Sequence, residues 1–261
     1  LHDINLFRGD VLSQYWQKSP VALLNAVDVS KLVPDTNSLV AIITQTDLPS
    51  KIITGNEDEQ LRLISGPFKT FQKPASPWTV LIHAVENLFP EYDTFRRQIT
   101  WLPMWRFEDC MLSWANKGGS VGRHYDQFSV FLVQLSGRKH WELGPKATED
   151  TQSSSNKHLN LVASSFENWQ GVFEPGDALY LPPNTIHKGK AIDDNCVTLS
   201  IGFRAPDAIS LLEAALESPL ADKTNLRFED KGRSEPDAPA KISAADQKRA
   251  KKAILAYLDQ P

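Results

Sequence analysis

The sequence has too few cysteines for a disulfide framework or a cysteine-rich zinc site. Only two occur among 261 residues, Cys110 and Cys196, and neither belongs to a CxxC pattern. Structural zinc sites use four protein ligands, usually including cysteines. Both cysteines lie in apolar, strand-like runs, so we expect reduced, buried side chains, as in a cytoplasmic protein.

Long hydrophobic runs and an excess of positive charge are also missing. The apolar run around residues 130–133 is much shorter than the roughly 20 residues that cross a bilayer. No basic-then-apolar leader opens the chain. The formal net charge is −4, which leaves no basic footprint for nucleic acid. We therefore expect no membrane span, no export and no direct nucleic-acid partner, whereas a basic protein partner is compatible with this charge.

The first hundred residues mix helical and extended segments, and a different texture begins near Cys110. Residues 9–27 predict a helix that ends near Pro20 and an extended apolar run after it, because a residue before proline avoids the helical region. Residues 76–92 show a helical period that we expect Pro90 to end. From Cys110 onward, short β-branched and aromatic runs alternate with turn residues, which is typical of an antiparallel sandwich or barrel.

The strand texture stops after Arg204. Residues 205–220 predict a helix with one apolar stripe. Residues 224–241 are polar and contain prolines, so they predict a linker or an exposed loop. Residues 243–258 predict a second helix, which opens with a capping-box spacing at Ser243. Its apolar face must be buried against its own domain, a partner subunit or a part that this chain lacks.

Two triplets between Gly118 and Gly144 share a His-x-acid spacing: His124-Tyr125-Asp126 and His140-Trp141-Glu142. Alternate side chains of a strand point the same way, so either triplet can place an imidazole and a carboxylate on one face. With 32 acidic residues and 6 histidines in the chain, a chance triplet is about as common as not, and only its context can give it meaning.

The context favours the first triplet. The face that carries His124 and Asp126 continues with apolar side chains, as the inside of a small barrel should: Phe128, Val130 and Leu132. In the returning strand, an inward-pointing Trp141 turns His140 and Glu142 towards solvent. We interpret the second triplet as a surface pair that only resembles a metal site.

A third ligand candidate follows a proline corner later in the chain. His187 begins an extended stretch after a Gly-Asp turn and an apolar strand. Two histidines and one carboxylate match the facial triad that holds Fe(II) and leaves coordination positions open. The same residues also fit a plain alternative, in which His124 and His187 are hydrogen-bonded histidines of a β domain.

Lys139 favours the metal interpretation. It shares a strand face with Trp141, and a lysine in an apolar interior is costly unless an anion neutralises it. The distal carboxylate of a metal-bound 2-oxo acid supplies such an anion. The alternative is a side chain that reaches solvent at the hairpin end.

Three stretches carry a family resemblance: "GGSVGRHYDQFSVFLVQLSGRKHWELG", "FEPGDALYLPPNTIHKG" and "LSIGFRAP". They resemble the bacterial JmjC-type ribosomal oxygenases of the cupin superfamily, and the similarity extends to "YWQKSPVALLNA" and "GPFKTF". The resemblance implies a mainly β fold with helices, a double-stranded β-helix of the jelly-roll type. It implies a catalytic domain over residues 1–205 and a helical dimerisation region over 206–261, hence a homodimer. The winged-helix-like domain that follows in the family has no counterpart in this chain.

The resemblance also assigns roles to residues. It implies His124, Asp126 and His187 as ligands of catalytic Fe(II), with 2-oxoglutarate and O2 as cosubstrates. Lys139 falls where the family holds the distal carboxylate of 2-oxoglutarate; the best-known bacterial arginine hydroxylase has arginine there, whereas the human branch has lysine. The strand with Thr198 and Ser200 supplies a further polar contact to the cosubstrate in the family. Ordinary hydroxyls lining a barrel are the alternative for both.

The implied function is hydroxylation of an arginine side chain in a ribosomal protein of the large subunit. Glu108 and Asp109 could bind a guanidinium group, although a solvated turn explains them equally well. Two alternatives remain open. One is a metal-binding cupin without oxygenase activity, such as an isomerase or a small-molecule binding module. The other is an oxygenase that acts on a histidine or on a non-ribosomal substrate.

Overall fold

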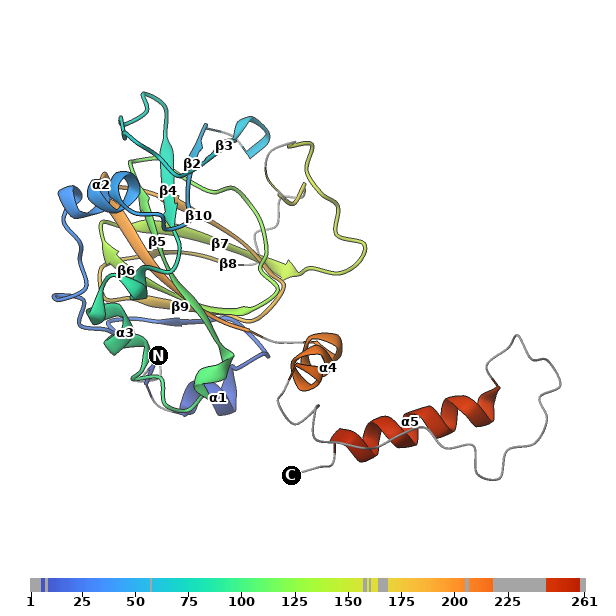
Figure 1. Ribbon diagram of the computed structural model, residues 1–261. Coiled ribbons are helices and arrows are strands. Elements are labelled where there is room, and N and C mark those ends of the chain that lie inside the picture. The colour runs from blue at the N-terminus through green and yellow to red at the C-terminus, as the bar shows by residue number, and fades with distance from the viewer. Residues whose placement is uncertain are drawn as a thin grey trace. The chain divides into compact units, whose positions relative to one another are not determined.

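The computed structural model describes residues 6–7, 9–56, 58–156, 159, 161–163, 169–204, 207–217 and 243–258. The chain divides into two compact units, residues 1–205 and 206–261 (Figure 1). In chain order, the first unit contains α1 (Asp10–Gln14), β1 (Val21–Leu23), α2 (Thr36–Gln45), β2 (Ser50–Thr54), η1 (Asp58–Gln60), β3 (Arg62–Ser65), β4 (Trp78–Ile82), η2 (Val85–Asn87), α3 (Pro90–Arg96), η3 (Met104–Arg106), β5 (Phe107–Ala115), β6 (Ser129–Ser136), β7 (Lys139–Lys146), β8 (Trp169–Phe173), β9 (Ala178–Leu181), β10 (Thr185–Ala191) and β11 (Cys196–Phe203).

The strands of the first unit form two antiparallel sheets. The larger one has the order β1-β9-β6-β11-β5-β4-β2-β3, and the smaller one has the order β10-β7-β8. Consecutive strands β6 and β7 lie in different sheets, which is how the chain closes a jelly roll. The expected mainly β, jelly-roll fold is confirmed.

The larger sheet is buried on both faces, and strand parity assigns each face its own core. On β6, Phe131 and Val133 pack with residues of α2 and α3 in the main core. Val130 and Leu132 point the other way and pack with Trp141 of the smaller sheet. Each such side chain contributes about 1.5–3 kcal/mol when fully buried. The second face is the one that lines the functional cavity.

The expected helix over residues 76–92 is wrong. Residues Trp78–Ile82 form strand β4, a 3-10 turn follows over Val85–Asn87, and α3 begins at Pro90. Proline suits the first turn of a helix because its missing N–H has no intrahelical acceptor there. Val80 is completely buried in the main core, and a strand covered on both faces lacks the alternation that marks a half-exposed strand.

The helix that we expected to end near Pro20 ends earlier, because α1 stops at Gln14. The expected extended run is confirmed, since β1 begins directly after Pro20. β1 pairs with β9 at the edge of the larger sheet.

The second unit contains the two expected helices, α4 (Ala208–Leu216) and α5 (Ala244–Leu258). Asp207 caps α4 by accepting a hydrogen bond from Ser210 N at 2.8 Å. Ser243 accepts a hydrogen bond from Asp246 N at 3.1 Å and donates to its carboxylate at 2.9 Å. The predicted linker over 224–241 lies outside the described residues. A role of residues 206–261 in dimerisation stays a prediction.

Both cysteines are free and buried, as expected. Burial raises the pKa of the thiols of Cys110 and Cys196, so both remain unreactive thiols at neutral pH. In the described part of the chain, no helix has the length and apolar character needed to cross a membrane.

Candidate metal and cosubstrate site

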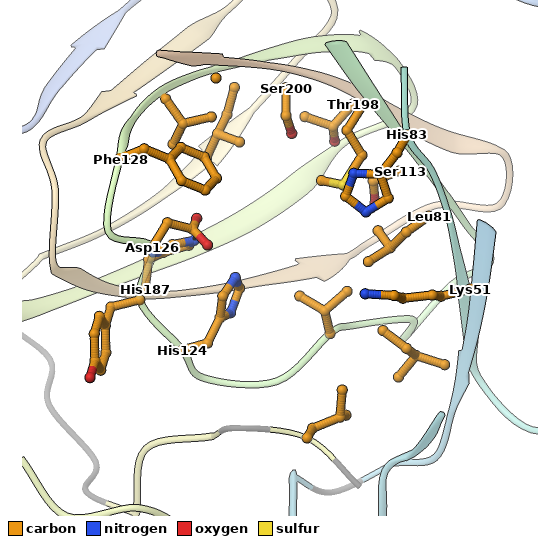
Figure 2. Close-up of a pocket in the computed structure, with 18 of the residues that line it drawn as sticks. Lys51, Leu81, His83, Ser113, His124, Asp126, Phe128, His187, Thr198 and Ser200 are labelled. Atoms are coloured by element: carbon orange, nitrogen blue, oxygen red, sulfur yellow. The ribbon is translucent and has the colours of Figure 1, made fainter. Parts of the chain in front are cut away.

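A cavity of about 390 Å³ lies in the first unit and is lined by residues of both sheets. Figure 2 shows its polar side chains. They form three groups: the His124–Asp126 pair with His187, the buried Lys139 with neighbouring hydroxyls, and a wall that carries Lys51. Most of the remaining lining is apolar. Convergent polar groups in an apolar cavity of this size are typical of a small-molecule site.

The first of these groups joins the three predicted ligands. One ligand atom from each of His124, Asp126 and His187 lies within 4.8 Å of the others. His187 Nε2 is 3.8 Å from a carboxylate oxygen of Asp126, and the two imidazole centroids are 4.3 Å apart. In Figure 2 all three side chains point into the cavity. The structure therefore brings together three side chains from two separate segments, which the sequence pattern had only suggested as ligands.

His124 and Asp126 do not lie on a regular strand, which corrects the expected geometry. β6 begins only at Ser129. His124 instead forms an isolated bridge to His187 of β10. His124 N donates to His187 O at 3.0 Å, and His187 N donates to His124 O at 2.8 Å. This is the hydrogen-bonded pair of an antiparallel ladder, which places the two residues directly opposite each other.

Each imidazole is oriented by a main-chain carbonyl two residues before it. His124 Nδ1 lies 3.0 Å from Gly122 O, and His187 Nδ1 lies 2.9 Å from Thr185 O. A carbonyl oxygen can only accept, so Nδ1 of each ring carries the proton. The lone pair of each Nε2 is then free for a metal ion, and a carbonyl on Nδ1 is a usual partner of metal-binding histidine.

Burial keeps His187 neutral. Desolvation, with the neighbouring His124 as a smaller cause, lowers the pKa of His187 to about 4. The side chain of Asp126 acts in the opposite direction. A neutral imidazole is the form that binds a metal ion, so His187 is in its metal-binding form at neutral pH.

The histidine and the glutamate of the second triplet lie outside the cavity. His140 and Glu142 are half-buried on the other face of β7 from the buried Trp141. Glu142 accepts a hydrogen bond from Arg123 at 2.9 Å and lies 3.8 Å from His140. Its partners are therefore a guanidinium group and one imidazole, which is an ion-pair arrangement and not a metal site.

Ser120 lies in a Gly-x-Ser-x-Gly spacing, which elsewhere marks the nucleophile of hydrolases. Its side chain is buried, and Ser120 Oγ accepts a hydrogen bond from Gly122 N at 3.1 Å. Ser120 does not line the cavity. Its hydroxyl shapes the turn that presents Gly122 O to His124.

The second polar group surrounds Lys139, whose side chain is buried next to Trp141. Lys139 Nζ donates to Thr198 Oγ1 at 3.2 Å and to Ser113 Oγ at 3.3 Å. Among the residues that the structure describes, no carboxylate forms an ion pair with it. Burial lowers the pKa of Lys139, because water no longer stabilises the ammonium group. An anionic ligand in the cavity would reverse that effect.

Thr198 and Ser200 both lie on β11 and line the cavity. Thr198 also donates to Gln134 Oε1 at 3.0 Å, so its hydroxyl is oriented towards Lys139 from a fixed position. Ser200 is buried further along the same face. Ser113 lies on β5, opposite Thr198. The sequence did not identify it as a contact of Lys139, although it shares a strand face with Asp109 and Met111.

The third polar group forms a side wall. Asp109 lines the cavity, and one of its carboxylate oxygens lies 2.9 Å from His83 Nδ1. Glu108, its neighbour, points elsewhere and forms an ion pair with Arg204. Of the two acidic residues considered for guanidinium binding, only Asp109 therefore reaches the cavity. Lys51 and His83 had no signal in the sequence, because their strands join the site only through sheet pairing.

The chemistry available to this cavity follows from its two ends. Two imidazole nitrogens and one carboxylate oxygen form a three-ligand set that suits Fe(II) or a similar divalent ion, with positions left for other ligands. A buried ammonium with two hydroxyls suits the free carboxylate of a small dianion. Among the described residues, the metal cluster contains no thiolate.

Comparisons with known proteins agree with the fold. The JmjC domain family matches residues 94–211. The chain is 30% identical over 243 residues to "Probable ribosomal oxygenase" of Haemophilus influenzae, covering 92% of this chain and 59% of that protein. It is 29% identical over 268 residues to "Ribosomal protein uL16 3-hydroxylase" of Escherichia coli, covering 100% of this chain and 69% of that protein. The chain thus spans about six to seven tenths of the length of these relatives.

Solved structures give the same result in three dimensions. The X-ray structure of E. coli ycfD superimposes with a TM-score of 0.82 at 27% sequence identity, covering 97% of this chain and 68% of that chain. YcfD in complex with cobalt and 2-oxoglutarate superimposes with a TM-score of 0.80, covering 97% and 66%. The fold, the His-Asp-His cluster and these similarities lead to one conclusion: residues 94–211 match the JmjC domain family, and the chain is similar to bacterial ribosomal oxygenases.

Proposed function

We propose that the first unit is an Fe(II)- and 2-oxoglutarate-dependent oxygenase that hydroxylates a side chain of a ribosomal protein. One observation carries the proposal. The His-Asp-His cluster, with both Nε2 atoms free, lines the same cavity as Lys139, a buried cation without a described acidic partner. A site for a divalent metal and a site for a distal carboxylate thus share one cavity.

The donor set fits iron better than a structural metal. His124, Asp126 and His187 would hold Fe(II) through two nitrogens and one oxygen. A closed zinc site needs a fourth protein ligand, and among the described residues the cluster contains no cysteine. With iron bound, O2 would be the oxidant and 2-oxoglutarate the co-reductant: one oxygen atom would hydroxylate a C–H bond, and the other would enter succinate as 2-oxoglutarate loses CO2.

The protein's own residues bind, orient and exclude water. Lys139 donates to the distal carboxylate of 2-oxoglutarate, and Thr198 and Ser113 hold the ammonium group in place. Ser200 is the further hydroxyl on that strand. Gly122 O and Thr185 O keep the two imidazoles in the tautomer that offers Nε2. Apolar side chains such as Phe128 and Trp141 line the rest and limit access of water.

For the substrate, we propose an arginine of the large-subunit ribosomal protein uL16. The E. coli relative carries the name uL16 3-hydroxylase, and Asp109 offers a carboxylate inside the cavity for a guanidinium group. Such a substrate places the activity in the cytoplasm. In this proposal the protein works as a homodimer through residues 206–261.

A second candidate is hydroxylation of a histidine. Lys139 favours it, because lysine and not arginine stands at the position that contacts the cosubstrate, as in the human branch of the family. Mass spectrometry decides between the two side chains. After incubation with Fe(II), 2-oxoglutarate and O2, uL16 should gain the mass of one oxygen atom on an arginine; a gain on a histidine of a ribosomal protein supports the second candidate.

The cofactor part of the proposal is tested without any protein substrate. Anaerobic titration with Fe(II) should give a visible charge-transfer band only when 2-oxoglutarate is added as well. A metal-binding cupin without oxygenase activity would bind iron and show no such band. Absence of the band, together with no succinate formed with any ribosomal protein, would rule out the oxygenase.

A further inference from the structure

Lys51 is the one cation on the side wall of the cavity that the proposed chemistry does not use. It lies on β2, is half-buried and points into the cavity (Figure 2). Strand register pairs Lys51 with Leu81, and Leu81 with Ser113. Two strand spacings, roughly 10 Å, therefore separate the backbone of Lys51 from that of Ser113, the partner of Lys139. The two lysines serve different parts of the cavity.

Lys51 has no counter-ion in the described residues of the chain, where neither an ion pair nor a hydrogen bond is made by its ammonium group. The side chains that line the cavity around β2 are apolar: Ile53, Leu63, Leu81, Val121 and Leu161. The Lys51 side chain is half-buried, so water can reach its ammonium group while the cavity is open. A polypeptide that displaces this water must supply acceptors in its place, since an unpaired buried charge is costly.

The other charges of the cavity are already matched. The formal charges of Fe(II), 2-oxoglutarate, Asp126 and Lys139 cancel. Asp109 has His83 as a neighbour at 2.9 Å and is the group that we assign to the guanidinium of the substrate. Lys51 is therefore left for another part of the incoming polypeptide.

We propose that Lys51 donates hydrogen bonds to main-chain carbonyl oxygens of the substrate, next to the side chain that is hydroxylated. This inference rests on the proposed function. A polypeptide entering the cavity brings carbonyl groups that need donors, and the apolar side chains around Lys51 offer none. The three N–H groups of lysine can serve more than one carbonyl.

Main-chain carbonyls are favoured over an acidic side chain. Ribosomal proteins bind RNA and are rich in basic residues, so a carboxylate near the target is not assured, whereas every residue supplies a carbonyl. Lys51 would then select for an extended polypeptide over a free amino acid and not for a particular flanking sequence.

Three variants test the proposal: Lys51→Met, Lys51→Arg and, as a matched control, Lys69→Met. Methionine keeps the length of the apolar stem and removes the donors, arginine keeps donors, and Lys69 is exposed and does not line the cavity. Binding of uL16 is measured with Mn(II) and a non-reactive 2-oxoglutarate analogue, and KM and kcat are measured with Fe(II). Thermal unfolding checks that each variant is folded.

We expect Lys51→Met to weaken uL16 binding and raise its KM about tenfold, since a hydrogen bond from a charged donor is worth about 1.5 kcal/mol or more. Lys51→Arg should stay within about threefold of the wild type, and Lys69→Met should be unchanged. The affinity for 2-oxoglutarate should remain within twofold in all three.

Unchanged uL16 binding in Lys51→Met overturns the inference, as does an equal loss in the methionine and arginine variants, which would indicate shape and not donation. A loss of 2-oxoglutarate affinity instead would assign Lys51 to the cosubstrate. Wild-type protein that shows the charge-transfer band but does not bind uL16 contradicts both the substrate assignment and this inference. Failure of the oxygenase proposal is recognised separately, by absence of the band.

Discussion

The two His-x-acid triplets have nearly the same composition and opposite surroundings. Asp126 lies beside His124 and His187 in one cluster that lines the cavity. Glu142 faces Arg123 at 2.9 Å on the outer side of β7. A carboxylate that meets a guanidinium is neutralised by it, whereas a carboxylate that meets two neutral imidazoles is left to bind a cation. The partner across the sheet decides which role the same spacing takes.

The largest expected difference between the triplets is in iron binding. Asp126→Ala removes the only carboxylate of the cluster, so we expect Fe(II) affinity to fall by more than about 100-fold, beyond the effect of losing an outer contact. Glu142→Ala should leave Fe(II) affinity within twofold and reduce stability by about 1–3 kcal/mol, because Arg123 loses the partner of a mostly buried pair. Anaerobic Fe(II) titration measures both. A loss in Glu142→Ala equal to that in Asp126→Ala would contradict the comparison.

Lys139 lies on the same strand as the second triplet, but its substitution should have a different effect from a substitution in either triplet. Lys139→Met should weaken 2-oxoglutarate binding by about 30-fold or more, as truncation of a buried charged partner costs at least about 2 kcal/mol. Fe(II) binding alone should be unchanged. Thermal stability without ligands should not fall, since an unpaired buried ammonium is removed. Lys146→Met, at the exposed end of β7, is the control. A fall in Fe(II) affinity in Lys139→Met would contradict the separation of the metal site from the carboxylate site.

The smallest expected effect is a pH dependence of 2-oxoglutarate affinity, which we assign to Lys139 alone. Burial holds the pKa of Lys139 below 10.5 in the unliganded protein, and a bound carboxylate favours the ammonium form and raises that pKa. Binding of 2-oxoglutarate then takes up protons, and its affinity falls as pH rises through the unliganded pKa. Calorimetry in two buffers of different ionisation enthalpy measures the uptake. Lys139→Arg, which stays charged, should abolish it; persistence of the uptake in that variant would assign it to another group.

Much of the site was predictable because its signals are local. The alternation along β7 separates Lys139 and Trp141 from His140 and Glu142, and the structure places the two sets on opposite faces of the strand. His187 was identifiable from its turn and its spacing. The alternation requires no knowledge of the partner strands.

The rest depends on pairing between distant segments, which a single sequence does not reveal. Ser113 reaches Lys139 only because β5 pairs with β11, and Lys51 reaches the cavity only because β2 pairs with β4. The wrong prediction of a helix over residues 76–92 has a related cause. β4 is covered on both faces by the fold, so its apolar side chains gave no two-residue period, and a helical interpretation took its place.

The two carbonyls that hold the histidine rings belong to the backbone, and so does the bridge between His124 and His187. A substitution of the Thr185 side chain leaves its main-chain oxygen in place. The orientation of the ligands is therefore robust to mutation around them and depends on the chain path alone. Evolution can change the residues between and beside the ligands, and with them the substrate, while the metal centre stays the same.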